Sequence, residues 1–278
     1  MLKQSLLIGW LTALLISPVI QAEPVLDQHQ PQPVRIALII DDLGNQRVAG
    51  EQAIELPGAV TYAFLPQTPF AWQLASKAHQ RNKEVMLHLP MESDHGNALG
   101  QGALTLDMSK ERFLRTLKRN IASVPYLAGV NNHMGSLLTR DPTSMRWLMG
   151  ELRREGLYFV DSRTTDATVA ERVADSNLIA SARRDVFLDN QPQVDKVREQ
   201  LGKLVAAARE KGSAIGIGHP YPATLSVLRE ELPKLKQQGI ELVPVSQIVH
   251  NGRLEWHASS FPSRRGVKNS KQSPSPIY

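Results

Sequence analysis

The chain has 278 residues, of which 42% are hydrophobic, enough to bury the core of one large α/β domain or of two small ones. Aromatic residues make up only 5%, which does not indicate a broad stacking surface, and the absence of cysteine excludes disulfides and thiolate chemistry. The formal net charge of +5 is carried by Lys3, Arg264, Arg265, Lys268 and Lys271, so residues 23–256 are neutral. This distribution argues against nucleic-acid binding.

The N-terminal residues have the features of an export signal. Lys3 precedes an apolar stretch over residues 6–20, and Ala22 stands where cleavage is expected. We therefore predict a signal peptide over residues 1–22 and a linker rich in glutamine and proline over residues 23–33. The alternative is an uncleaved membrane anchor, although the apolar stretch is shorter than the ~20 residues that span a bilayer. Both interpretations predict an exported, periplasmic domain.

From residue 34 onward, strand-like and helix-like segments alternate. Strands are predicted at 34–40, 60–65, 84–89, 127–130, 157–160, 186–188, 214–217 and 240–245. Helices are predicted at 47–55, 69–81, 109–123, 142–155, 193–211 and 222–238. Near-continuous aliphatic strands are typical of a parallel sheet covered on both faces, and seven or eight units in this length favour a closed or nearly closed barrel. We expect a single domain over residues 34–253.

Polar residues collect at the C-terminal ends of the predicted strands. They are Asp41, Asp42, His88, Glu92, Asn131, Asn132, His133, Asp161, Asp189, Asn190 and His219. In a parallel barrel these ends open on one face, where active sites lie. Taken singly, an aspartate after a strand is often a helix cap, and a histidine in an apolar segment is often a core residue. Asp41 and Asp42 cannot both be the cap, and side by side one of them should have a raised pKa unless a cation is present.

One or two carboxylates and two or three histidines at one barrel mouth suit zinc or a similar divalent ion. Three protein ligands leave a position open for water, which is the catalytic arrangement. Such an ion lowers the pKa of its bound water toward ~7 and polarises a carbonyl. One aspartate would then bind the cation, which compensates for the charge of the other and leaves that carboxylate to take a proton.

The motifs IIDDLG, HLPME, NNHMGS, DSRTT and GIGHP resemble the divergent polysaccharide deacetylase family, from about Val34 to Ile248. The resemblance implies a distorted (β/α) barrel with about seven parallel strands, an Asp-His-His metal site and hydrolysis of an N-acetyl group. By the matching motif, Asp41 would be the base and Asp42 a metal ligand. Ordinary polysaccharide deacetylases carry two metal histidines four residues apart, whereas here His88 is followed by Glu92 at that spacing.

The expected site follows from this resemblance. His133 is the best substitute for the absent second histidine, with Glu92 as the alternative, so Asp42, His88 and His133 would hold a divalent metal, with zinc expected. His219 would donate a proton to the departing amine. Asp161 and Arg163 would orient His219 or Asp41, because a catalytic group needs a partner that fixes its geometry.

The predicted function is metal-dependent removal of acetyl groups from an N-acetylated envelope polysaccharide or other glycan, by a monomer with no nucleic-acid partner. Two alternatives remain open: a metal-independent glycoside hydrolase that uses the barrel-mouth carboxylates, and a non-catalytic barrel that binds glycan or protein. Residues 254–278, rich in serine, proline and basic residues, are predicted to be a disordered tail. This tail is expected either to contact the anionic envelope weakly or to have no role.

Overall fold

The computed structural model describes residues 33–94, 96 and 98–250. The predicted signal peptide, nearly all of the predicted linker and the predicted tail lie outside these residues. Within the described part of the chain, no helix is both long and apolar enough to span a bilayer.

A single parallel sheet forms the centre of the domain. Its strands are β1 (Val34–Leu43), β2 (Thr61–Phe64), β3 (Glu84–Met91), β4 (Leu127–Met134), β5 (Tyr158–Asp161), β6 (Ser181–Arg183), β7 (Val186–Phe187), β8 (Ser213–Gly218) and β9 (Ile240–Leu242). They follow the order β6-β5-β4-β3-β2-β1-β8-β7, and β9 pairs with the first residues of β1. Every ladder is parallel, as the aliphatic strand sequences predict.

Two short strands link the ends of the sheet. β6 pairs with β5, whereas β7, two residues later, pairs with β8. Between them, Arg184 N–H donates to the carbonyl of Asp161 and Asp185 N–H donates to the carbonyl of Ile215, each at 2.9 Å. The chain from Ser181 to Phe187 therefore fills the position between β5 and β8. The prediction of a distorted (β/α) barrel with about seven parallel strands is confirmed, because β6 and β7 together occupy one strand position.

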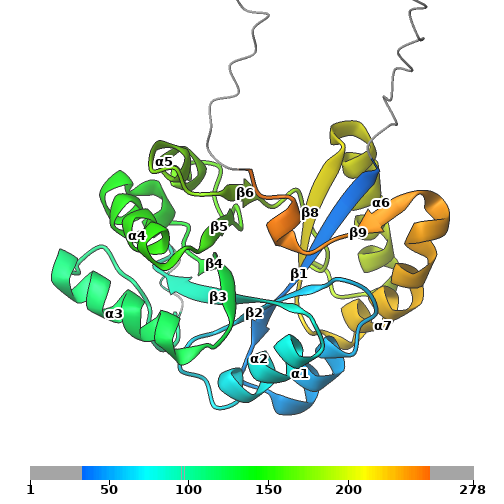
Figure 1. The fold of residues 1–278 in the computed structure, drawn as a ribbon, viewed down its shortest axis with the longest axis horizontal. Coiled ribbons are helices and arrows are strands. Elements are labelled where there is room, and N and C mark those ends of the chain that lie inside the picture. The colour runs from blue at the N-terminus through cyan, green and yellow to red at the C-terminus, as the bar shows by residue number, and fades with distance from the viewer. Residues whose placement is uncertain (1–32, 95, 97, 251–278) are drawn as a thin grey trace, which may run out of the picture. The chain divides into compact units, whose positions relative to one another are not determined.

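The helices lie outside the strands (Figure 1). They are α1 (Arg47–Ile54), α2 (Ala71–Gln80), α3 (Lys110–Ser123), α4 (Pro142–Glu155), α5 (Ala170–Ser176), α6 (Val194–Lys211) and α7 (Pro222–Glu231), with 3₁₀ turns η1 (Leu138–Arg140), η2 (Leu232–Gln238) and η3 (Val245–Gln247). The helices predicted from residues 109 and 142 begin with side-chain caps, because Ser109 and Asp141 each accept from the backbone N–H three residues later. The predicted helix over 222–238 is instead divided into α7 and η2, with Pro233 in the first turn of η2.

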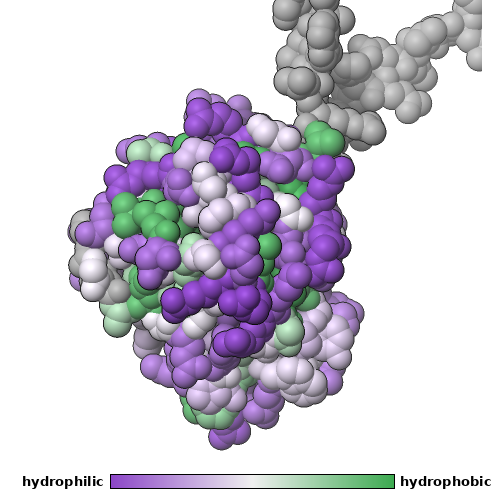
Figure 2. All heavy atoms as spheres, turned by 90° about the vertical axis from the view of Figure 1, so that its left-hand side faces the viewer, coloured by the Kyte–Doolittle hydropathy of each residue, from purple (hydrophilic) through white to green (hydrophobic). Residues whose placement is uncertain are grey.

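The helical period determines which side chains of the outer helices face solvent. On α3, Phe113 and Leu117 are buried toward the sheet, whereas Arg112, Arg115 and Arg119 are exposed. The face over α3, α4 and α5 is accordingly mostly hydrophilic (Figure 2). These helices stabilise the barrel with one face and keep the other in solvent.

The strands separate two apolar cores. On β1, Ile36, Leu38 and Ile40 point outward and pack beneath the helices, whereas Ala37 and Ile39 point into the barrel. The inner core is small, and its other fully or nearly buried members are Ala63, Met86, Tyr158, Val160, Ala182, Ile215, Ile217, Val243, Val245 and Ile248. The two-residue period of a strand then determines which later residues face the barrel mouth.

Close packing of α6 on β8 gives a stability prediction. A Cβ at Gly216 would lie 2.7 Å from Leu204 Cδ2 and 2.9 Å from Leu38 Cδ2, whereas a Cβ at Gly202, on α6, would meet nothing within 4 Å. We expect Gly216→Ala to lower the free energy of unfolding by about 1–3 kcal/mol through overpacking. As the matched control, Gly202→Ala should raise it by up to about 1 kcal/mol because alanine favours the helix. Urea denaturation measures both, and changes of the same sign would contradict this account.

Candidate active site

The inward-facing positions of several strands end in polar side chains. On β1 the series Ala37, Ile39 continues to Asp41, and the same two-residue step on β3 and β8 leads to His88 and His219. Since the strands are parallel, these side chains gather at the carboxyl end of the barrel. This convergence is expected from the sequence, and the structure brings the side chains together: His88 Nδ1 lies 3.6 Å from Asp41 Oδ2, and His219 Nε2 lies 3.8 Å from Oδ2 of the adjacent Asp42.

A bulge in β1 explains why two adjacent aspartates reach the same site. The pairing of β1 with β2 skips one residue between Ile40 and Leu43, and Asp42 has a left-handed backbone with φ of 59°. In a regular strand, consecutive side chains would point to opposite faces. Here His88 Nε2 lies 3.3 Å from Asp42 Oδ1, so one histidine contacts both carboxylates. Asp41 is buried, and Asp42 is partly open to the mouth.

Three possible ligand atoms converge at this mouth. His133 Nδ1 lies 3.0 Å from both Asp42 Oδ1 and His88 Nε2, and the latter two atoms are 3.3 Å apart. Ligand atoms at ~2.0–2.1 Å from a tetrahedral zinc ion lie roughly 3.3 Å from one another, close to these separations. Asp42 Oδ1 is buried, yet it accepts no hydrogen bond of suitable geometry from any residue that the structure describes. An orphaned carboxylate oxygen facing two ring nitrogens fits a divalent cation.

The amide of Asn131 fixes the orientation of His88. Asn131 lies opposite His88 in the β3–β4 ladder, and its Oδ1 is 2.9 Å from His88 Nδ1. Its Nδ2 donates to Asp41 Oδ1 at 2.8 Å and to Asp41 Oδ2 at 3.1 Å. Because the amide nitrogen serves the carboxylate, the amide oxygen must accept from His88. The Nδ1 of His88 therefore carries a proton, and its Nε2 points to Asp42 and His133.

His133 is positioned by the last residues of β4 and by the turn that follows them. It follows Asn131 by two residues and so faces the same side, while the intervening Asn132 is turned away. The Asn132 amide donates to the carbonyl of Met134 at 2.7 Å and accepts from the N–H of Ser162 at 2.8 Å. Left-handed backbone at Met134 and Gly135 then ends the strand directly after His133.

His219 is held by a buried aspartate. Asp189 Oδ1 lies 2.9 Å from His219 Nδ1, and Asp189 Oδ2 accepts from the His219 N–H at 2.6 Å and from the Thr224 hydroxyl at 2.7 Å. This leaves His219 Nε2 facing the site, 3.8 Å from Asp42 Oδ2. The ring also stacks on Phe187, with centroids 6.0 Å apart.

The two aspartates have opposite pKa shifts. Burial raises the pKa of Asp41 above its ordinary 3.8 despite the nearby His88, His219 and Asn131. Burial also acts on Asp42, but the contacts with His133 and His88 outweigh it and hold the Asp42 pKa well below 3.8. A carboxylate that stays ionised suits a metal ligand, and one with a raised pKa suits a proton acceptor.

The histidine pKa values reflect the same charges. Burial alone would lower the pKa of His88, but Asp41 and Asp42 outweigh it and raise it to about 9. Burial would likewise lower the pKa of His219, whereas the hydrogen bond that its ring donates to Asp189 and the charges of Asp41, Asp189 and Asp42 raise it. The neighbouring aspartates therefore favour the protonated, positively charged form of both imidazoles. A divalent cation would replace the proton of His88.

The structure does not bring Asp161 and Arg163 to the expected positions. Asp161 points away from the barrel interior and accepts from the Arg163 N–H and the Thr168 hydroxyl, each at 2.8 Å. The Arg163 side chain contacts Asp166 at 3.4 Å. His219 is oriented instead by donating to Asp189, and Asp41 by accepting from Asn131. Asp161 thus shapes the loop after β5, because the inward-facing residue of that strand is Val160.

Glu92, the alternative ligand, is also turned elsewhere. Its Oε2 accepts from the backbone N–H of Leu106 at 2.6 Å, and its carbonyl accepts from Leu137 and Leu138. The cluster of possible ligands in the described chain comprises Asp42, His88 and His133. Glu92 instead anchors the loop between β3 and α3.

Three residues at the site have no role in the mechanism expected from the sequence. Asn131 and Asp189 lie at the ends of predicted strands, and Arg184 lies just before the strand predicted at 186–188. Arg184 donates to the carbonyls of Ser162 at 2.7 Å and Arg163 at 2.9 Å, and its guanidinium lies 4.0 Å from the Phe187 ring centroid. A two-residue step from inward-facing Ala182 would have found it.

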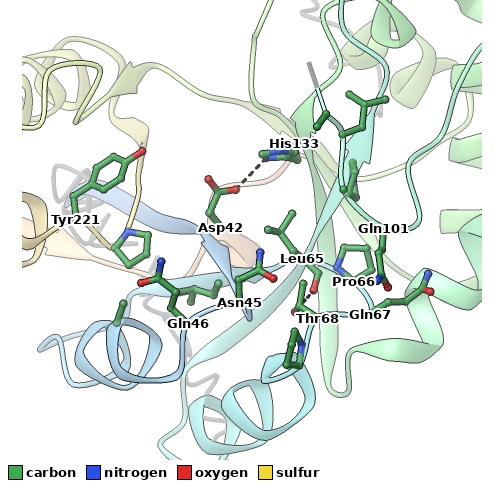
Figure 3. A pocket seen from close by; sticks show the side chains of 18 residues that line it. Asp42, Asn45, Gln46, Leu65, Pro66, Gln67, Thr68, Gln101, His133 and Tyr221 are labelled. Carbon is green, nitrogen blue, oxygen red and sulfur yellow. Dashed lines mark hydrogen bonds and ion pairs between the residues drawn. The ribbon is translucent and has the colours of Figure 1, made fainter. Parts of the chain in front are cut away.

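A cleft of about 530 Å³ opens beside the cluster. Asp42 and His133 form part of its wall, with Gln46 and Tyr221 on one side and Gln67 and Gln101 on the other (Figure 3). Its remaining lining is Leu43, Asn45, Ala49, Leu65, Pro66, Thr68, Pro69, Pro90, Ala98, Leu99, Gly100 and Pro220. The cluster is therefore accessible to a ligand of the size of a few sugar units.

A distorted parallel barrel with an Asp-His-His cluster at its carboxyl rim defines the class of polysaccharide-deacetylase-like barrels. Residues 38–249 match the model of the family described as divergent polysaccharide deacetylase. The Escherichia coli K12 protein YibQ is 35% identical over 240 residues, which cover 86% of this chain and 74% of that protein. The chain belongs to the divergent polysaccharide deacetylase family.

Solved structures share the fold. An uncharacterized protein from Agrobacterium tumefaciens C58 superposes with a TM-score of 0.76 at 23% identity, over 79% of this chain and 91% of that one. The catalytic domain of a peptidoglycan N-acetylglucosamine deacetylase from Eubacterium rectale gives a TM-score of 0.50 at 12% identity, over 82% and 94%. At these identities, the similarity establishes the common fold.

Proposed function

We propose that the protein is a metal-dependent hydrolase that removes acetyl groups from an N-acetylated polysaccharide. The observation that carries the proposal is the convergence of three lone-pair atoms beside a separate buried carboxylate. The family and the similarity to a peptidoglycan N-acetylglucosamine deacetylase support the substrate class. The export features of residues 1–22 support a role in the cell envelope.

Asp42, His88 and His133 would hold the ion, with zinc favoured by two imidazoles and one carboxylate. When bound, such an ion lowers the pKa of a coordinated water toward ~7 and polarises a carbonyl group. The protein itself contributes the fixed tautomer of His88, set by Asn131, and the ionised state of Asp42. Asp42 is therefore ready to bind the ion, whereas His88 is held in the right orientation and would release its Nε2 proton as the ion binds.

Asp41 is the proposed general base. It does not belong to the ligand cluster, and its raised pKa makes it a better proton acceptor than an ordinary aspartate. The two hydrogen bonds from Asn131 hold its carboxylate beside His88. Asp41 would take the proton of the attacking water at one of its carboxylate oxygens.

His219 is the proposed general acid. Its Nδ1 is bound to Asp189, so the proton available for transfer is on Nε2, which lies 3.8 Å from Asp42 Oδ2. That proton would pass to the nitrogen of the departing amine as the C–N bond breaks. Asp189 acts as a positioning residue that keeps the imidazole charged and correctly turned.

The test is acetate release from N-acetylglucosamine oligomers by the purified domain. We expect release to stop after chelation and to return when zinc is added, with a bound metal near one per chain. Chain cleavage that survives chelation would favour a metal-independent glycoside hydrolase. Oligosaccharide binding without acetate release in the metal-loaded protein would favour a non-catalytic glycan-binding barrel.

Replacing the positioning residue should change the pH dependence. The raised pKa of His219 keeps its acidic form present at higher pH, and this form is lost as the pH rises through that value. Asp189→Asn removes the charge, so the alkaline limb of the kcat profile should move to lower pH and kcat should fall by roughly 10²-fold. Acetate release measured across pH checks this. An unchanged alkaline limb would rule out His219 as the acid supported by Asp189.

A further inference from the structure

The cleft beside the metal cluster has an unusual charge pattern. Among the described residues that line it, Asp42 and His133 belong to the cluster, and the others carry no formal charge. Four of these other residues are carboxamides: Asn45, Gln46, Gln67 and Gln101. Prolines and leucines form most of the remaining wall. Away from the metal site, the described residues of this lining offer hydrogen bonds and apolar contact but no ionic partner.

Carboxamides suit one kind of ligand. Each presents two N–H donors and one carbonyl acceptor, so it can pair with hydroxyl groups, which donate and accept, and with acetamido groups. An anionic group placed against these described residues would lose water without gaining a cationic side chain. The lining therefore favours uncharged, polyhydroxylated units over acidic ones. Apolar residues between the amides fit the C–H faces of a pyranose.

One rim of the cleft is held in place before any ligand binds. The Gln67 Nε2 donates to the Oδ1 of buried Asn120 at 2.7 Å, and the Asn120 Nδ2 donates to the carbonyl of Gly102 at 2.7 Å. Asn120 thus ties together two loops that line the cleft, those after β2 and after β3. A Cβ at Gly102 would lie 2.2 Å from Asn120 Oδ1, so the hydrogen bonds of Asn120 to both loops require glycine at position 102. Gln67 has a strained left-handed backbone with φ of 58°.

We propose that Asn45, Gln67 and Gln101 are specificity-determining residues that select uncharged N-acetylated sugar units next to the reacting one and reject units bearing a carboxylate. Asn120 is the positioning residue of this rim. The inference rests on the proposed function for the place of the reacting sugar, but it concerns binding at neighbouring positions. It can therefore be measured without turnover.

The experiment compares two tetrasaccharides by calorimetry on the zinc-loaded chain in an Asp41→Asn background, which is expected to keep the metal without turning the sugar over. They are the N-acetylglucosamine tetramer and the same tetramer with one internal unit oxidised to a uronate. We expect the neutral chain to bind at least about tenfold more tightly, because the uronate would be desolvated without a partner. Asn45→Asp and Gln101→Glu, which keep size and add charge, should each weaken binding of the neutral chain by roughly five- to tenfold, the effect of losing one net hydrogen bond. Gln80→Glu, exposed on α2, is the matched control.

Gln101→Arg gives a gain-of-function test. It places a cation in the cleft and should reduce or reverse the preference against the uronate chain. Equal binding of the two tetrasaccharides by the parent, or cleft variants indistinguishable from Gln80→Glu, would overturn the inference. Hydrolysis of a small acetyl ester, which does not occupy the cleft, reports separately on the metal site. Its absence alongside an intact preference would refute the proposed function while leaving the charge selection in place.

Discussion

Asp41→Asn is expected to lower kcat for acetate release by roughly 10²–10⁴-fold, the usual contribution of a general base, while bound metal stays near the parent amount. An amide cannot take a proton from water at neutral pH. Metal should remain because the cluster of possible ligands comprises Asp42, His88 and His133. The asparagine carbonyl can still accept from Asn131, which limits disturbance of the fold.

Elemental analysis and an acetate assay on the same preparation check this prediction. Asp107→Asn, on the exposed loop before α3, serves as the control for loss of one carboxylate outside the ligand cluster. Simultaneous loss of metal and activity in Asp41→Asn would mean that Asp41 is itself a ligand. Full activity with full metal would remove Asp41 from the mechanism.

The barrel could be predicted because its main signals are local. Each long strand is a continuous aliphatic segment, and the start of α4 is marked by Asp141 followed by proline. The elements that escaped prediction are short: β6 has three residues and α5 has seven. Their sequences have too few residues to display a period. Tertiary pairing defines them, as when β6 joins β5.

The roles of the strand-end residues were harder to predict than their positions. Strands buried on both faces carry no polar alternation, so the segment that ends in Val160 and Asp161 does not reveal which residue points inward. Asp161 and Asp189 are therefore equivalent in the sequence, and only the packing turns Asp189 toward His219. The bulge at Asp42 is a further irregularity that pattern alone does not indicate.

The hydrogen bonds of Asn131 show that contacts between strands are also difficult to predict from the sequence. Its amide joins a ligand, His88, to the proposed base, Asp41, through one donor and one acceptor. The sequence places these residues on three different strands, and their pairing depends on the register of β3 against β4 and on the barrel bringing β1 close. Long-range register is a property of the folded sheet. It could be inferred only after the fold was known.

The ligand assignment that departs most from ordinary polysaccharide deacetylases is His133, and its replacement should have a large effect. His133→Ala removes one of three converging lone pairs, so metal affinity should fall by more than the roughly 10–100-fold that loss of an outer-shell partner costs. Acetate release should fall with it and recover partly at high zinc concentration. Dialysis against buffered zinc followed by elemental analysis measures the affinity.

Glu92→Ala is the matched comparison because Glu92 occupies the position where ordinary family members carry their second histidine. Its carboxylate binds the N–H of Leu106, so this variant should loosen the loop after β3 and keep its metal. If metal were lost in Glu92→Ala and retained in His133→Ala, the third ligand would be Glu92 and not His133. Because Asp42 and His88 already converge with His133 within 3.3 Å, that result would require the loop to rearrange on metal binding.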